Sequence, residues 1–96
     1  MFDRILREMQ ERVRTRQYIV TLHAEEEMED DELSIFDVER AVLTGKIVER
    51  QRDNQTTEWK YRLSGESINN KKTELITKIS VTGKLVFITA YAMDKI

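Results

Sequence analysis

The hydrophobic positions near the start of the chain repeat at helical spacing. Apolar side chains recur three or four residues apart at Phe2, Ile5, Leu6, Met9 and Val13. This is the pattern of an amphipathic helix with one buried stripe. Oppositely charged residues four positions apart, such as Asp3 and Arg7, would form ion pairs on the exposed surface of this helix. We therefore predict a helix over residues 3–15.

The pattern changes after residue 17. Tyr18–Leu22 is a short run of β-branched, aromatic and aliphatic residues, which favours a strand. It leads directly into a polar segment that starts at His23, in which only Ala24 and Met28 share an apolar stripe. The sequence thus predicts a strand followed at once by a helix that packs by a narrow edge.

A third helix is predicted over residues 35–44 by its capping signals. Ser34 suits the N-cap, and Asp37, three residues later, resembles the acidic member of a capping box. Gly45 follows the last apolar position of this segment, where we expect a left-handed residue to end the helix.

The second half of the chain reads as strands. We predict four strands: Ile47–Arg52, Glu58–Leu63, Thr73–Val81 and Leu85–Ala90. They are separated by a polar turn at 53–57, a looser Gly65–Lys72 loop and a tight Thr82-Gly83 hairpin. Short connections favour antiparallel neighbours. The fold class is therefore α+β, with N-terminal helices packed on one face of an antiparallel sheet of four or five strands.

Alternation in the second of these strands separates apolar from basic side chains. Trp59, Tyr61 and Leu63 share one face, whereas Lys60 and Arg62 share the other. Lys78 joins the two basic residues if the register of the neighbouring strand permits. We expect the apolar face to meet the helices and the basic face to meet solvent.

Composition places the chain among small globular proteins. Its 96 residues suffice for one hydrophobic core and predict a single domain over 1–96. With 40% hydrophobic and 35% charged residues, the chain is too apolar for a disordered protein and too charged for a membrane span. The N-terminus lacks the pattern of a secretory signal, so the expected location is the cytoplasm.

Residue usage restricts the chemistry. The chain has no cysteine and one histidine, His23, which excludes a thiolate nucleophile and predicts no metal site built from cysteines or several histidines, and no cofactor. The net charge of −2 conceals strong segregation. Residues 23–45 contain nine acidic residues and one arginine, whereas residues 46–96 contain ten basic residues and six acidic ones. Because salt confines each field to roughly 10 Å, an RNA partner remains compatible with the acidic total.

His23, Arg62 and Lys78 are the candidate catalytic residues for metal-independent RNA cleavage. That reaction needs a base for the 2′-hydroxyl, an acid for the leaving oxygen and cations for the developing charge. His23 would serve as base or acid, because its unperturbed pKa lies near neutrality. Arg62 and Lys78 would stabilise phosphate charge, and Lys60 would position the RNA backbone. Alternatively, His23 caps or packs a strand-to-helix junction, and the basic residues only solvate the open side of the sheet.

Two further features have competing interpretations. Tyr61 or Tyr91 could stack on an RNA base, but Tyr61 shares the apolar face, which leaves Tyr91 as the candidate RNA-binding aromatic. The acidic stretch Glu25–Glu32 could bind a divalent ion. Consecutive carboxylates on a helix point in different directions, so a solvated face or a docking surface for a basic partner is favoured.

The order and spacing of several short segments resemble the domain of unknown function 4258 family over about residues 18–93, which leaves the first helix outside. These segments are Leu22-His23-Ala24, Met28, Leu33-Ser34-Ile35, Asp37-Val38, Leu43-x-Gly45, Ile47-Val48-Glu49, Tyr61-x-Leu63-x-Gly65 and Val86-Phe87-Ile88-Thr89-Ala90-Tyr91. That family is similar to toxins of the RelE and BrnT type, which cleave RNA or block translation and are neutralised by a cognate antitoxin. Some relatives resemble partners of zinc-finger antitoxins of the YgiT type.

This resemblance implies RNA or the ribosome, and an antitoxin protein, as partners. The chain departs from the family pattern at Glu27, an acid where relatives commonly have an arginine in His-Ala-x-x-Arg-Met. If that arginine binds phosphate, the acid predicts altered or lost activity. A non-catalytic interaction module of the same fold, with protein partners or a homodimer, is therefore the alternative.

Overall fold

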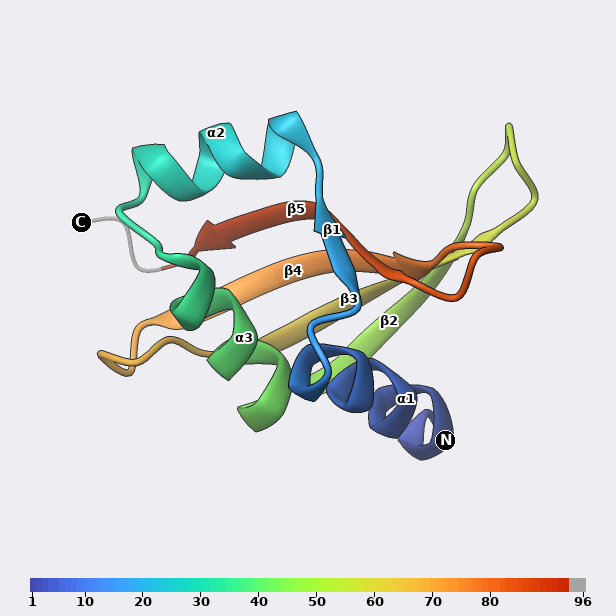
Figure 1. Cartoon of the computed structure of the whole chain (residues 1–96), viewed down its shortest axis with the longest axis horizontal. Helices are drawn as coiled ribbons and strands as arrows, with labels where there is room; N and C mark the ends of the chain where they lie inside the picture. Colours follow the sequence, from blue (N-terminus) through green and yellow to red (C-terminus); the bar gives the residue numbers. More distant parts are fainter. Residues whose placement is uncertain (94–96) are drawn as a thin grey trace.

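The computed structural model describes residues 1–93, and the last three residues of the expected 1–96 domain lie outside the described residues. The elements follow one another along the chain as three helices and five strands (Figure 1). They are α1 (Asp3–Arg14), β1 (Tyr18–Val20), α2 (Leu22–Asp30), α3 (Ile35–Thr44), β2 (Lys46–Arg52), β3 (Trp59–Glu66), β4 (Lys72–Ile79) and β5 (Leu85–Ala92).

The five strands form one sheet in the order β1-β5-β4-β3-β2. All neighbours are antiparallel except β1 and β5, which run parallel. The predicted α+β class is confirmed, and the sheet is mixed because of this one edge pair. Short turns force only consecutive strands to be antiparallel, whereas β1 reaches β5 through the rest of the chain.

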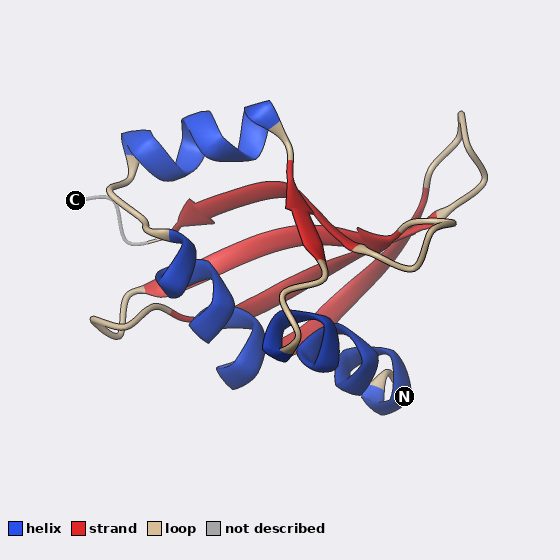
Figure 2. Cartoon of the chain, in the orientation of Figure 1, coloured by secondary structure: helices blue, strands red, loops and turns tan. Residues whose placement is uncertain are grey.

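The described helices lie together on one side of the sheet (Figure 2). Each contributes buried apolar side chains to a single cluster with the inward residues of β3, β4 and β5: Met9, Val13, Ala24, Met28, Val38, Ala41, Val42, Leu63, Leu75 and Phe87. The expected stripe of Ala24 and Met28 on α2 is thereby confirmed. No helix of residues 1–93 is long and apolar enough to cross a membrane.

The expectation for Gly45 was wrong. Its φ of −91° and ψ of 178° are extended rather than left-handed. The glycine is needed for space, because a Cβ at Gly45 would meet the carbonyl oxygens of Ala41 and Ser64, the latter at 2.9 Å. A Cβ at Gly65 would likewise lie 2.9 Å from the Cα of Ala41. Two glycines therefore let the end of α3 approach the backbone of β3.

Several predicted boundaries also shift; β4, for example, ends at Ile79 and not at Val81, and two of the other shifts have a clear local cause. Leu22, expected at the end of a strand, begins α2, because Thr21 accepts a hydrogen bond from the Ala24 backbone N–H and acts as its N-cap. Gly65, expected in a loop, lies within β3, since the ladder with β4 continues to the pair Glu66 and Lys72.

The predicted capping box of α3 is present, and it reaches a second element. The Asp37 carboxylate accepts hydrogen bonds from the Ser34 N–H at 2.8 Å and from the Ile68 N–H at 3.0 Å. Burial acts to raise the pKa of Asp37, but these hydrogen bonds outweigh it and hold the pKa below the ordinary 3.8. One carboxylate thus fixes both the start of α3 and the loop between β3 and β4.

Replacing Asp37 with alanine should lower the free energy of unfolding by about 1–2 kcal/mol at pH 7. Because the folded pKa is depressed, this contribution is present above the unfolded value of 3.8 and is lost as pH falls through the folded pKa. Urea unfolding at neutral and strongly acidic pH measures the difference, with exposed Asp30→Ala as control. An equal difference at both pH values would contradict the assignment.

Candidate nucleic-acid interface

The side of the sheet away from the described helices, here called the open face, carries the basic residues that alternation predicted. The register places Arg62 beside Ile76 and Lys78 beside Val86, so β3 and β4 present their cations on the same side. Leu63, on the opposite side, is fully buried under the helices. The predicted separation of apolar and basic faces in β3 is therefore confirmed.

Arg62 is held by two carboxylates. Its Nη1 donates to Glu74 Oε1 at 2.8 Å, and its Nε lies 3.4 Å from Glu49 Oε1. The hydrogen bond to Glu74 is the main reason that the pKa of Arg62 is raised. The Glu74 side chain is only 4% exposed, whereas that of Arg62 is 37% exposed. Removing Arg62 alone would therefore leave a buried carboxylate without its partner.

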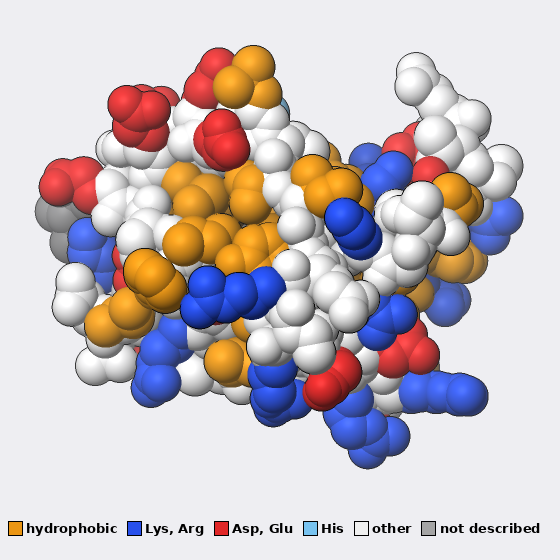
Figure 3. Space-filling view, in the orientation of Figure 1, with side chains coloured by type: hydrophobic (Ala, Val, Ile, Leu, Met, Phe, Trp, Pro, Cys, Tyr) orange, Lys and Arg blue, Asp and Glu red, His pale blue; other side chains and the backbone are white. Residues whose placement is uncertain are grey.

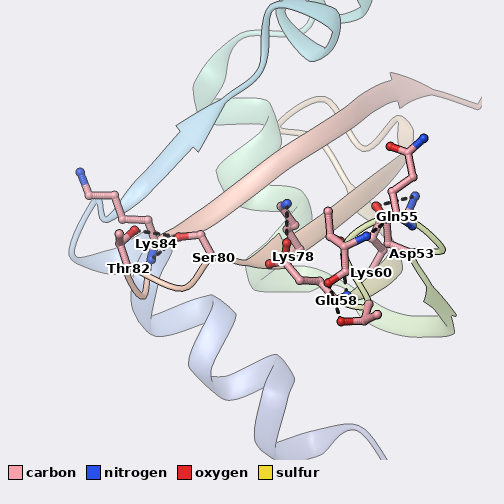
Figure 4. Close-up of polar contacts among 10 residues, drawn as sticks. Asp53, Gln55, Glu58, Lys60, Lys78, Ser80, Thr82 and Lys84 are labelled. Carbon is pink, nitrogen blue, oxygen red and sulfur yellow. Dashed lines mark hydrogen bonds and ion pairs between the residues drawn. The ribbon is translucent and has the colours of Figure 1, made fainter.

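Lys60 and Lys78 also have acidic partners. Lys78 Nζ lies 3.2 Å from Glu58, and Lys60 Nζ lies 3.8 Å from Asp53 in the turn between β2 and β3 (Figure 4). A hydrogen bond from the Gln55 N–H, with help from Lys60, lowers the pKa of Asp53. The two lysines thus belong to one network of alternating charges at the turn end of the open face.

His23 lies at the first turn of α2 with its side chain 65% exposed. Its Nε2 is 3.4 Å from Glu27 Oε1, one helical turn further along. Two strand spacings, about 10 Å, separate β5, against which α2 packs, from β3, which carries Arg62. The structure therefore groups Lys60, Arg62 and Lys78 on one face and places His23 beside the other edge of the sheet.

Glu27 has a structural role that sequence patterns did not reveal. β1 pairs with β5 only from Leu85 to Phe87, so the rest of this edge has no strand partner among the described residues. Glu27 Oε1 accepts from the Ala90 N–H at 3.1 Å, and Asp31 Oδ2 accepts from the Ala92 N–H at 2.8 Å. Two carboxylates one helical turn apart, one on α2 and one at its C-cap, thus accept hydrogen bonds from two amides of β5 that point to the same edge. This pairing covers a free sheet edge.

The two candidate tyrosines occupy different sides. Tyr91 stands opposite Glu74 in the β4–β5 ladder and is half-buried on the open face. The Tyr61 ring instead meets Phe2, the N-cap residue of α1, edge to face, with centroids 6.1 Å apart. The structure thus agrees with the alternation that left Tyr91 as the aromatic residue on the basic side.

The acidic stretch of α2 forms a charged outer surface. Figure 3 shows acidic side chains over α2 and basic ones gathered around α1 at the opposite end of this view. Within residues 1–93, no group of three or more histidine, cysteine, aspartate or glutamate side chains is arranged to hold a metal ion. Glu27 and Asp31 face β5 and serve its backbone, so the stretch does not converge on one point.

Sequence similarity agrees with the arrangement of the strands and helices. A family model described as Domain of unknown function (DUF4258) matches residues 20–92, which run from β1 to the end of β5. The chain belongs to the DUF4258 family. No curated protein and no solved structure matches it. The DUF4258 match leaves α1 outside, as the sequence predicted, although α1 contributes Met9 and Val13 to the common core.

In this DUF4258 chain, Glu27→Ala should lower the free energy of unfolding by about 1–2 kcal/mol, because the Ala90 N–H loses its acceptor. Glu27→Gln retains an acceptor oxygen and should cost less. The exposed neighbour Glu26→Ala is the control, with an expected change within about 0.5 kcal/mol. Urea unfolding and amide exchange at Ala90 measure the effect. If Glu27→Ala and Glu26→Ala behave alike, Glu27 does not protect this edge.

Proposed function

We propose that this chain is a toxin-like RNA-acting protein of the RelE and BrnT type, and that it binds RNA phosphates with the open face of its sheet. The observation that supports this proposal is the cluster of Lys60, Arg62 and Lys78 on one face. Cations on adjacent strands are spaced to follow a polyanionic backbone. Tyr91 on the same face supplies a ring on which an unpaired base can stack.

Each open-face cation already has a carboxylate partner, so RNA binding is an exchange of partners. A phosphate that approaches Arg62 must share its guanidinium with Glu74. The guanidinium allows this, because its two carboxylate partners contact only Nε and Nη1 and leave further N–H donors for a phosphate. Affinity should therefore depend on the local balance between cations and carboxylates, and should fall as salt rises.

The proposed cleavage chemistry assigns His23 as general base or acid. Its imidazole is exposed and accessible to a ligand, and its Nε2 lies 3.4 Å from Glu27 Oε1. Arg62 and Lys78 would stabilise charge on the phosphate, and Lys60 would position the backbone. RNA would have to extend from β3 across β4 and β5 to meet both groups. A cognate antitoxin would cover this face.

A non-catalytic interaction module is the second candidate. One argument for it is that the same ion pairs neutralise each of the three cations. Another is the distance between β3 and β5, the strand against which the His23 helix packs. On this account the open face binds a protein partner or a second copy of the chain, and the RNA chemistry is lost.

The decisive experiment is RNA cleavage by the purified protein in EDTA, with and without ribosomes. The wild type should cleave, and His23→Ala should lower the rate by about a hundredfold or more if His23 is the general base or acid. Circular dichroism at matched temperature checks the fold. Absence of cleavage by the wild type in both conditions would contradict the catalytic account and leave the interaction module.

Variants that neutralise Glu74 test the role of Arg62 without burying an unpaired carboxylate. Glu74→Gln releases Arg62 from the closer of its two carboxylate partners and should tighten RNA binding, whereas adding Arg62→Gln to this variant should weaken binding again. Labelled single-stranded RNA measures both affinities. Equal affinities for the two variants would exclude Arg62 as a phosphate contact.

A further inference from the structure

A second group of basic and aromatic side chains lies on the opposite face of the sheet from Lys60 and Arg62, on strands β2 and β3. Arg52 pairs with Trp59 across the β2–β3 ladder, and Arg50 pairs with Tyr61. The guanidinium carbons of Arg50 and Arg52 lie 3.9 Å and 4.8 Å from the centroid of the Trp59 ring. These three residues, Arg50, Arg52 and Trp59, are called the Arg–Trp cluster below. The cluster was not among the candidate residues identified from sequence.

The Arg–Trp cluster borders a groove between α1 and the sheet. One hollow of about 310 Å³ is lined in part by Trp59, Tyr61 and Ile79, and an adjoining one of about 220 Å³ by Phe2 and Arg50. Both hollows share Ile5 and Tyr61, so they lie next to each other beside α1. Trp59 itself is 38% exposed. A planar ligand can therefore approach Trp59 and the guanidiniums that lie over its ring from solvent.

The charge around this groove differs from that of the open face. Neither Arg50 nor Arg52 takes part in an ion pair with a carboxylate within residues 1–93, whereas Lys60, Arg62 and Lys78 all do. Two carboxylates line the hollows. Glu58 is already paired with Lys78, and Glu8 lines the smaller hollow together with Arg4 and Arg50. The two guanidiniums of the cluster are thus available to an anion.

We propose that the Arg–Trp cluster and its groove bind an unpaired segment of single-stranded RNA. A base would stack on Trp59, or on the guanidinium plane that lies over it, while Arg50 and Arg52 contact flanking phosphates. This inference rests on RNA as the partner in the proposed function, but not on cleavage. Stacking needs an exposed base face, so a duplex, whose bases are already stacked, does not satisfy the site.

Trp59 is the only tryptophan in the chain, so its fluorescence reports directly on the site. The ligand is an oligouridylate of roughly ten nucleotides with 2′-O-methyl groups, which binds like RNA but lacks the nucleophile for cleavage. It should quench Trp59, whereas inorganic polyphosphate and a duplex of equal length should not. Quenching of equal size by polyphosphate would show that charge alone is recognised, and would overturn the inference.

Variants separate stacking from charge. With a labelled oligomer, Trp59→Leu should weaken binding about tenfold, and Trp59→Phe, which keeps a ring, should retain most of the affinity. Arg50→Gln and Arg52→Gln should each weaken binding and reduce its salt dependence. Lys84→Gln removes an exposed lysine that belongs to neither site, so it is the matched control and should leave the Trp59 quenching unchanged. Thermal unfolding confirms that each variant is folded.

The outcomes distinguish this site from the proposed function. RNA binding could depend on Arg62 without changing Trp59 fluorescence, and with the same affinity in Trp59→Leu as in the wild type. That result would contradict binding at the Arg–Trp cluster and support binding at the open face. Binding that depends on Trp59 in a protein that does not cleave RNA would support the cluster and contradict the catalytic account.

Discussion

The close approach of α3 to β3 determines which side of the sheet is covered. Gly45 and Gly65 have no side chain where the carbonyl group and Cα of Ala41 come near, so the helix packs directly on the strand backbone. That contact buries Leu63 and commits alternate residues of β3 to the core. Lys60 and Arg62 must then face away from the helices. The basic character of the open face is a consequence of this one contact.

At two places a carboxylate is the partner of a group that would otherwise lack one: a guanidinium in one case and backbone N–H groups in the other. Glu74 neutralises Arg62 in a nearly buried position on the open face. Glu27 and Asp31 satisfy the part of β5 that β1 does not reach. The acid at position 27 therefore has a structural role, as the acceptor for a backbone amide of β5. Its loss would expose a strand edge, which is a common origin of aggregation.

Sequence predicted those features that depend on local chemistry. The Ser34–Asp37 capping box and the face of Leu63 follow from spacing along one segment, and both are present. The direction of β1 and the partners of Glu27 depend on contacts between distant segments, for which no local pattern exists. Gly45 was misassigned because a glycine after a helix usually adopts positive φ, whereas here it provides space for a neighbouring strand.

The same distinction applies to the candidate sites. Alternation identified Lys60 and Arg62, but their carboxylate partners became evident only from the register. Arg50 and Arg52 were overlooked because a basic residue in an edge strand ordinarily serves solubility. Their stacking on Trp59 requires the β2–β3 pairing and the end of α1 to be known.

The most direct test of the central claim, that the open face binds RNA, is an NMR titration of the isotope-labelled protein with the non-cleavable single-stranded oligomer. The account predicts chemical-shift changes centred on Arg62, Ile76 and Lys78 and their neighbours on β5. Shifts that leave the open face unchanged, whether they fall on the Arg–Trp cluster or on α2 and α3, or no shifts at near-millimolar RNA, would contradict it.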